Sequence, residues 1–206
     1  MLLRKTRGKK ICVICEGYEE LEYMITLINK AVFSQVYEFV LINAKSINTI
    51  FPRYLERFQS DSYSLVLIFC DTDKGPSKEY LELKRKINEF HDADVADDIV
   101  IFGNPCTMQI MLSHFAEVKL TSQSKSVNGK YIEKLLGISN YKATEEQRKK
   151  FFSKIKQGNY KLMKKNIAKL STNDEEVPST NFLKFVKCFE SEDESWIEEI
   201  NHKLYE

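Results

Sequence analysis

An apolar run in this chain ends in two aspartates that stand one residue apart. The segment "YSLVLIFCD" (63–71) is apolar up to Asp71, and Asp73 follows after a single threonine. On an extended chain the two carboxylates would project to the same side, as a pair of oxygen ligands for one hard cation must. The letters "DTDKGP" (71–76) are also typical of a polar turn. The pattern by itself leaves both interpretations open.

A third acid stands at the end of an earlier apolar run. "KICVICEG" (10–17) is short, contains β-branched residues and closes with Glu16 and a glycine. Ligands of open parallel sheets collect beyond the carboxyl ends of the strands, so we expect Glu16, Asp71 and Asp73 to converge at one edge. Three carboxylates there would repel one another unless a cation neutralised them. The set favours Mg²⁺, which takes few carboxylates and bridges to phosphate oxygens, with Mn²⁺ as a substitute.

Strands and helices alternate over the first half of the chain. Short apolar runs predict strands at 10–17, 38–44, 63–71 and 97–103. Helical spacing of apolar residues predicts helices over 19–33, 48–60 and 77–91. The first helix is expected to bury Leu21, Met24, Ile25, Ile28 and Val32. Ser77 is the expected N-cap of the third helix. Parallel strands need crossovers, so the pattern predicts an α/β fold with a parallel sheet of about four strands and flanking helices.

From about residue 105 onward the pattern becomes mostly helical. Amphipathic segments predict helices at 105–115, 130–137, 145–158, 160–170, 181–190 and 195–206. The polar stretch "STNDEEVPST" (171–180) is the expected linker before the last two helices. Those two are expected to dock through Phe182, Phe185, Trp196, Ile197 and Leu204. We therefore predict an α/β core over residues 1–120 and a helical extension over 121–206 that packs on it.

Composition argues against a membrane protein and against a disulfide framework. The chain has 206 residues, of which 43% are apolar and 30% charged, and it lacks the stretch of roughly 18 apolar residues that a membrane span needs. Its five cysteines are an odd number, and four of them lie in or beside apolar runs, which suits reduced, buried thiols. We expect a cytoplasmic protein that does not associate with membranes.

Positive charge is concentrated in one part of the chain. Residues 119–170 carry fourteen basic and three acidic side chains, whereas residues 171–206 carry three basic and ten acidic ones. A basic block of this density suits a polyanion such as nucleic acid. It equally suits a solvated helix surface that the acidic tail neutralises. Charge alone does not decide between the two.

At its acidic motifs the sequence resembles a known family. A strand followed by glutamate-glycine and a helix, and a later strand ending in aspartate-x-aspartate, resemble the TOPRIM domain of topoisomerases, primases, OLD-family nucleases and RloB-like proteins. The segment "FGNPCTMQIMLSHF" (102–115) is similar to the stretch that follows the fourth strand of RloB-like proteins. The positions that match this stretch are Asn104, Pro105, Cys106, Leu112, His114 and Phe115. The resemblance covers about residues 10–170.

The resemblance implies a Rossmann-like TOPRIM sheet and a role for each acid. Glu16 would be a metal ligand or general base, and Asp71 and Asp73 would hold Mg²⁺. The chain departs from the family where Lys74 and Gly75 replace a histidine and where Met108 replaces a glutamate. The helix after Glu16 also has fewer acids than the family. Those that could substitute are Glu19, Glu20 and Glu22.

Two functions remain open at this point. The first is a magnesium-dependent nuclease that hydrolyses DNA or RNA, which the resemblance places in defence against phage or other foreign nucleic acid, alone or with a partner protein. The second is a catalytically weak TOPRIM-derived protein that binds nucleic acid or regulates a partner. Expected contacts to phosphate are Lys74, Lys125, Lys130 and Lys134. Tyr131 and Tyr141 are candidates for stacking on bases.

Overall fold

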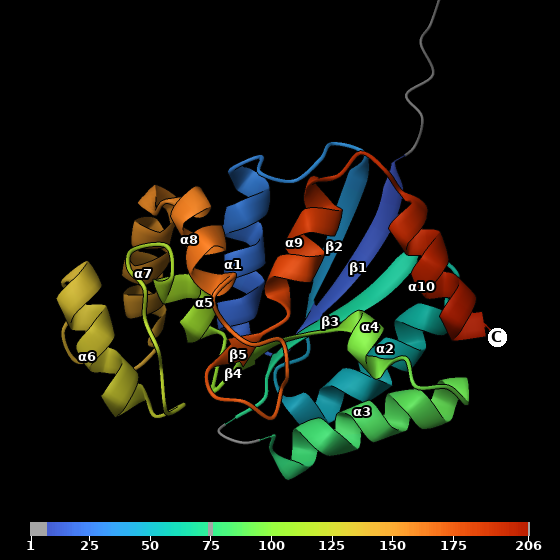
Figure 1. The fold of residues 1–206 in the computed structure, drawn as a ribbon, viewed down its shortest axis with the longest axis horizontal. Coiled ribbons are helices and arrows are strands. Elements are labelled where there is room, and N and C mark those ends of the chain that lie inside the picture. The colour runs from blue at the N-terminus through green and yellow to red at the C-terminus, as the bar shows by residue number, and fades with distance from the viewer. Residues whose placement is uncertain (1–7, 74–75, 206) are drawn as a thin grey trace, which may run out of the picture.

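A five-stranded sheet forms the centre of the protein. The computed structural model describes residues 8–73 and 76–205, and Figure 1 shows the strands in the order β2-β1-β3-β4-β5. The bounds are β1 Lys9–Cys15, β2 Tyr37–Asn43, β3 Leu65–Asp71, β4 Val100–Asn104 and β5 Ser179–Thr180. The first four strands pair in parallel, and β5 pairs antiparallel with β4. The predicted α/β class and its four parallel strands are confirmed.

Two details of the sheet differ from the prediction. The fourth strand begins later than expected, because the short helix α4 (Ala96–Ile99) takes up the start of "DDIVIFG". The two-residue strand β5 lies inside the stretch predicted as a linker. Two residues are too few to show an alternating pattern, so the strand is revealed by the pairing of Ser179 with Asn104 and of Thr180 with Gly103. Part of the C-terminal half therefore extends the sheet.

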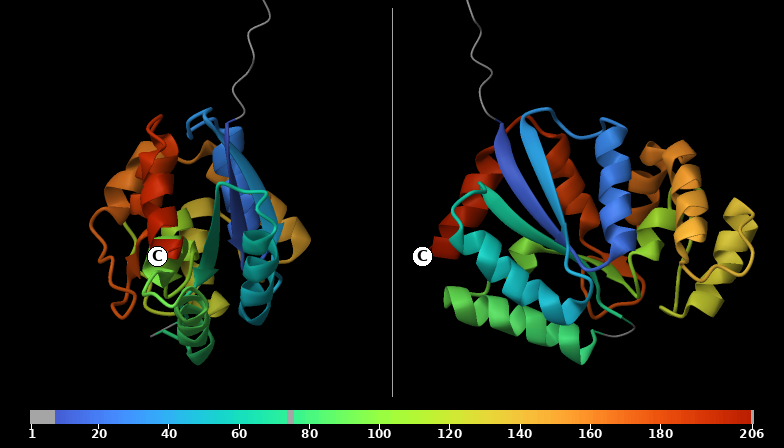
Figure 2. Two further views of the ribbon diagram at one scale, coloured as in Figure 1. Left: turned by 90° about the vertical axis from the view of Figure 1, so that its right-hand side faces the viewer. Right: turned by 180° about the vertical axis from the view of Figure 1, so that it is seen from behind.

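Helices cover both faces of the sheet. On one face lie α2 (Ile50–Gln59), which follows the 3₁₀ turn η1 (Ile47–Thr49), and α3 (Lys78–His91). On the other lie α1 (Tyr18–Asn29) and α9 (Phe182–Glu190). Figure 2 shows the C-terminal helices and α2 on opposite sides of the sheet. The ring of Phe69 in β3 stacks on that of Phe182 at 5.4 Å. Such burial on both faces explains why the strands are almost uniformly apolar.

The remaining helices extend this layer arrangement. Figure 1 shows α5 (Met108–Leu112), α6 (Lys125–Leu136), α7 (Glu145–Gln157) and α8 (Tyr160–Ile167) gathered beyond α1, with α10 (Ser195–Tyr205) at the opposite end. Helix α7 packs directly on α1. Phe182, Phe185, Ile197 and Leu204 are buried as predicted, whereas Trp196 is half-buried. None of the helices in the described ranges 8–73 and 76–205 is long and apolar enough to cross a membrane.

Local sequence signals account for the helix starts better than for the buried faces. The Ser77 hydroxyl accepts a hydrogen bond from Tyr80 N at 3.2 Å, so the predicted N-cap of α3 is confirmed. The predicted apolar stripe of α1 is wrong at Ile25, which is 41% exposed. Helix α1 turns another face inward. Its buried residues are Glu20, Tyr23, Met24, Thr26 and Leu27.

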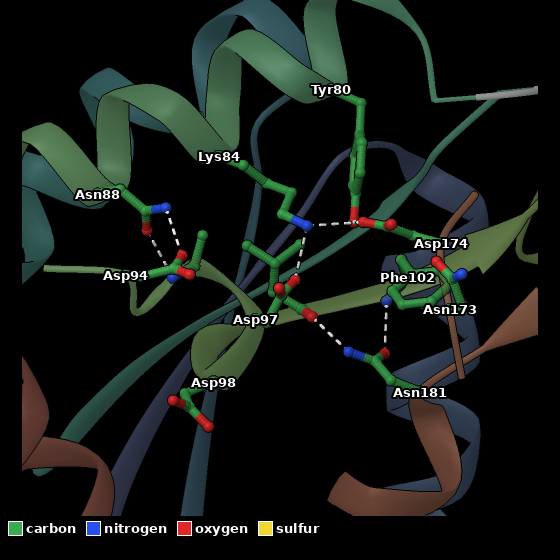
Figure 3. A network of polar contacts seen from close by, with 12 residues as sticks. Tyr80, Lys84, Asn88, Asp94, Asp97, Asp98, Phe102, Asn173, Asp174 and Asn181 are labelled. Carbon is green, nitrogen blue, oxygen red and sulfur yellow. Dashed lines mark hydrogen bonds and ion pairs between the residues drawn. The ribbon is translucent and has the colours of Figure 1, made fainter.

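A polar network fastens the loop before β5 to the rest of the fold. Asp174 Oδ2 accepts hydrogen bonds from Tyr80 OH at 2.9 Å and from Lys84 Nζ at 2.7 Å (Figure 3). Lys84 also pairs with Asp97 at 2.7 Å. The carbonyl of Asp174 accepts a hydrogen bond from the Asn104 side chain at the end of β4, at 2.6 Å. These contacts hold the loop at the end of β4 where the candidate site begins.

Replacement of Asp174 with alanine should destabilise the protein. The change leaves the hydroxyl of buried Tyr80 without its acceptor and Lys84 with one carboxylate in place of two. We expect the free energy of unfolding, measured with urea, to fall by about 1–3 kcal/mol. Glu175→Ala, an exposed acid in the same loop, is the matched control and should change it by less than about 0.5 kcal/mol. Equal stability of the two variants would show that the network does not hold the loop.

Candidate functional site

Glu16 and Asp71 lie side by side at the carboxyl ends of neighbouring strands. Strands β1 and β3 are paired in parallel with Cys15 opposite Phe69, so Glu16 follows the end of β1 beside the last residues of β3, Cys70 and Asp71. Glu16 N donates to the carbonyl of Phe69 at 2.9 Å. Asp71 N donates in turn to Glu16 Oε2 at 3.1 Å. The backbone pairing thus brings together two of the three acids that the sequence singles out.

Glu20 adds a third carboxylate from the first turn of α1. It is 5% exposed, and its Oε2 accepts a hydrogen bond from Gly17 N at 3.0 Å. A glutamate at this position of a helix often satisfies the free backbone amide at the helix start, which explains why it turns back toward the strand end. Its neighbours turn elsewhere. Glu19 accepts a hydrogen bond from Tyr141 OH at 2.7 Å, and Glu22 lies 3.8 Å from Arg148 Nε.

Thr107 connects two of these acids. Its backbone N donates to Asp71 Oδ1 at 2.6 Å, and its hydroxyl donates to Glu20 Oε1 at 2.5 Å. Gly103 permits this approach, because a Cβ there would lie 2.8 Å from Thr107 N. Sequence analysis did not single out Thr107, since a threonine before a short helix carries no signal of its own. Only the packing of this turn against β3 and α1 shows its role.

Burial and mutual repulsion raise the proton affinity of the three acids. Burial raises the pKa of Glu16 to about 7, and repulsion from Glu20 adds to the rise, against the opposing hydrogen bond from Asp71 N. Burial, followed by the charges of Glu20 and Glu16, also raises the pKa of Asp71 well above its usual range. The pKa of Glu20 is raised by burial despite the hydrogen bond from Thr107. The cluster therefore holds more negative charge than its hydrogen bonds offset.

The side chain of Asp73 takes no part in the hydrogen bonds that join the other three acids and Thr107. It is exposed and has a left-handed backbone with φ of 57°. The chain does not stay extended through this residue, so the same-side spacing predicted for Asp71 and Asp73 does not apply. The charge of Asp73 still raises the pKa of Glu16, as the weakest of the contributions to that pKa. Its own pKa is raised by partial burial and by Glu79.

The acids offer the oxygen donors that a hard cation prefers, but they do not form a complete coordination shell before the ion binds. Within the described ranges, no group of three or more His, Cys, Asp or Glu side chains is arranged to hold a metal ion. Both oxygens of Glu20 accept hydrogen bonds. Glu16 Oε1 and Asp71 Oδ2, in contrast, accept none from the described part of the chain. Two free carboxylate oxygens suit Mg²⁺, which is usually bound by one or two carboxylates plus waters.

A pocket of about 340 Å³ opens above these acids. Its wall includes the backbone and side chains of Glu16, Gly17, Tyr18, Glu19, Glu20, Lys45, Asp71, Ala143 and Arg148. Four of these lining residues are acids and two are cations, Lys45 and Arg148, which together with Tyr18 we call the rim residues. Arg148 Nη1 donates to the carbonyl of Ala143 at 2.6 Å, and its guanidinium lies 4.9 Å from the centre of the Tyr18 ring. These rim residues come from three distant segments, so no sequence spacing joins them.

A smaller hollow of about 50 Å³ lies on the far side of Asp71 and Glu19. Helix α6 closes it with Asn128 and Ile132, and Met108 and Tyr141 also line it. Tyr141 is only 4% exposed and donates to Glu19. The prediction that Tyr141 stacks on bases is therefore wrong, because its ring is enclosed. Tyr131 is half-buried and packs against the core.

The predicted lysines have different positions relative to the acids. Lys74 lies outside the described residues, and Lys125 begins α6 without a described side chain. Lys130 and Lys134 are exposed on α6, and neither forms an ion pair with any residue that the structure describes. Lys130 lines a hollow of about 400 Å³ that also includes Tyr141 and Lys142. Helix α6 thus places exposed positive charge beyond Tyr141, on the side of the smaller hollow.

Comparisons with known proteins identify no relative. No family model, no curated protein and no solved structure matches the chain.

The stability of the metal-free protein should depend on the ionisation of Glu16. The pKa of this acid rises from 4.5 to about 7 on folding, so stability is fully present below pH 4.5 and is lost as the pH rises through 7. Glu16→Gln keeps an acceptor for Asp71 N but cannot ionise. In EDTA at pH 8 we expect this variant to be more stable than the natural protein by about 1–3 kcal/mol.

Urea unfolding at pH 4.5 and pH 8 tests this expectation. The advantage of Glu16→Gln should vanish at the lower pH, where the natural glutamate is protonated. Glu192→Gln, at an exposed acid on the far side of the fold, should show no advantage at either pH. If Glu16→Gln were no more stable than the natural protein at pH 8, the acids would not repel one another as described.

Proposed function

We propose that this protein is a magnesium-dependent nuclease with a TOPRIM-like sheet, and that it hydrolyses phosphodiester bonds. The observation that carries the proposal is the convergence of Glu16, Glu20 and Asp71 at the carboxyl ends of β1 and β3 under an open pocket. Parallel α/β sheets bind their ligands at this edge. Buried acids with strongly raised pKa values are characteristic of functional sites.

The acids would have two roles, binding of the metal ion and proton transfer. Glu16 Oε1 and Asp71 Oδ2 are the free oxygens that would hold Mg²⁺. When bound, this ion would neutralise charge on the phosphate and activate water. Glu16 can also orient the attacking water or accept its proton, since its pKa of about 7 lies near physiological pH. Thr107 keeps Asp71 Oδ1 and Glu20 engaged, which fixes the direction of the remaining Asp71 oxygen.

The rim supplies positive charge where a phosphodiester would enter. Arg148 and Lys45 stand on the pocket wall, in addition to the lysines predicted on α6. Arginine binds phosphate through a planar fork of donors, and the Arg148 guanidinium lines this pocket although its Nε is buried. Acids and cations in one pocket suit a substrate whose negative charge is bridged to the acids by a metal ion. A role in defence against foreign nucleic acid rests on the family resemblance alone.

A second function fits two observations at the site. Both oxygens of Glu20 are occupied by protein donors. Met108 lies beside Asp71, where the family resemblance leads one to expect a glutamate. A site with two free carboxylate oxygens could bind a metal and nucleic acid without efficient cleavage. The alternative is therefore a TOPRIM-derived protein that binds nucleic acid or regulates a partner.

Cleavage assays on labelled DNA and RNA with Mg²⁺ or Mn²⁺ separate the two functions. We expect cleavage that EDTA abolishes and that Asp71→Asn reduces by about 100-fold or more, because the variant loses a metal-binding oxygen. Asp61→Asn is the matched control, since Asp61 is exposed and remote from the pocket in a left-handed turn that asparagine tolerates. Its cleavage rate should equal that of the natural protein.

Two results would contradict the nuclease proposal. Cleavage that survives in Asp71→Asn would come from a contaminating enzyme. Tight binding of nucleic acid without cleavage under any metal would support the alternative function.

A further inference from the structure

Tyr18 is an exposed aromatic residue at the mouth of the acidic pocket. It is 54% exposed, although the inward face of α1 begins only two residues later with Glu20. Its ring contributes to the pocket wall together with Glu16 and Asp71. Tyrosine rings at helical positions usually serve a core or an interface. The fold does not use this ring for a core, so its surface is available to a ligand.

Arg148 holds one side of this ring. Its guanidinium lies 4.9 Å from the ring centre. The arginine is itself fixed, because Nη1 donates to the carbonyl of Ala143 and its head lies 3.8 Å from Glu22. Only 17% of the Arg148 side chain is exposed, so it cannot swing freely. With one face against a fixed guanidinium and 54% of its surface exposed, Tyr18 presents a flat, oriented platform.

The position of the platform relative to the acids suggests what it recognises. Tyr18 follows Glu16 by two residues, so their Cα atoms are at most about 7 Å apart. A phosphate held over the acids would therefore place a neighbouring nucleobase within reach of the ring. The pocket volume of about 340 Å³ falls at the lower end of the range of about 300–1,000 Å³ for small-ligand sites. An aromatic ring beside cationic side chains, here Arg148 and Lys45, is typical of sites that stack the bases of single strands.

We propose that Tyr18 and Arg148 form a nucleobase-stacking site that selects unpaired nucleic acid. The placement of the adjacent phosphate over the acids rests on the proposed function. In a duplex both faces of an internal base are covered by its neighbours, so only a single strand, an overhang or an unpaired base offers a free face to Tyr18. Stacking on an aromatic ring does not depend on base identity. The site therefore selects strand state rather than sequence.

Equilibrium binding of oligonucleotides tests this site without requiring turnover. The ligands are a labelled single strand of twelve nucleotides, the same strand in a duplex, and an abasic strand of equal length and charge, all with Ca²⁺ in place of Mg²⁺. We expect Tyr18→Ala to weaken binding of the base-containing single strand by about 10-fold. Tyr18→Trp should stay within about 3-fold of the natural protein, because tryptophan also stacks. The abasic strand should bind the natural protein and Tyr18→Ala equally.

The controls separate this inference from the proposed nuclease function. Tyr205→Ala removes another exposed aromatic ring, 69% exposed and on α10, and should not change binding. Thermal unfolding of each variant verifies that it folds. Binding that depends on Tyr18 in a protein that never cleaves would uphold the stacking site and overturn the nuclease. Three results would overturn the stacking site. The first is cleavage of nucleic acid while Tyr18→Ala binds the single strand as tightly as the natural protein does. The second is a loss of binding in Tyr18→Ala that is as large for the abasic strand as for the base-containing strand, and the third is no binding of any single strand by the natural protein.

Discussion

Two neighbouring parallel strands end within two residues of each other, and this holds together two carboxylates that repel each other. The pairing of β1 with β3 puts Glu16 next to Asp71, and the first turn of α1 adds Glu20. In water these groups would separate, but here the backbone prevents it. Burial and the repulsion between the acids together raise the pKa of Glu16 to about 7. The proposed metal site and its chemistry both depend on that enforced proximity.

The surroundings relieve the repulsion only in part. Thr107 donates two hydrogen bonds into the cluster, and the close approach of its turn depends on Gly103. Arg148 stands at the rim of the pocket and is already engaged with Ala143 and Glu22. The hydrogen bonds consequently do not occupy every carboxylate oxygen, and the acids face an open pocket. A cation that enters this pocket would bind the free carboxylate oxygens and offset the repulsion between the acids. This is the physical basis of the proposed metal chemistry.

Sequence periodicity was sufficient to predict the four parallel strands and the strand ends that carry Glu16 and Asp71, because buried parallel strands are uniformly apolar and end abruptly. Periodicity did not predict those features of the site and of α1 that tertiary packing determines. The left-handed backbone at Asp73 ends the extended spacing predicted for the aspartate pair, and Ile25 faces outward because α1 buries Tyr23 and Leu27. Thr107 and Arg148 reach the site from segments far along the chain, so their contacts follow from how helices α5 and α7 pack.

Crystals of the protein soaked with Mn²⁺ test the central claim most directly, since anomalous scattering locates the ion. The account predicts a manganese peak within about 2 Å of Glu16 Oε1 and Asp71 Oδ2, with waters completing its shell. The same soak of Asp71→Asn should show no peak there. A fully occupied manganese site elsewhere, or Glu16 and Asp71 engaged by side-chain cations with no peak between them at saturating Mn²⁺, would contradict the account.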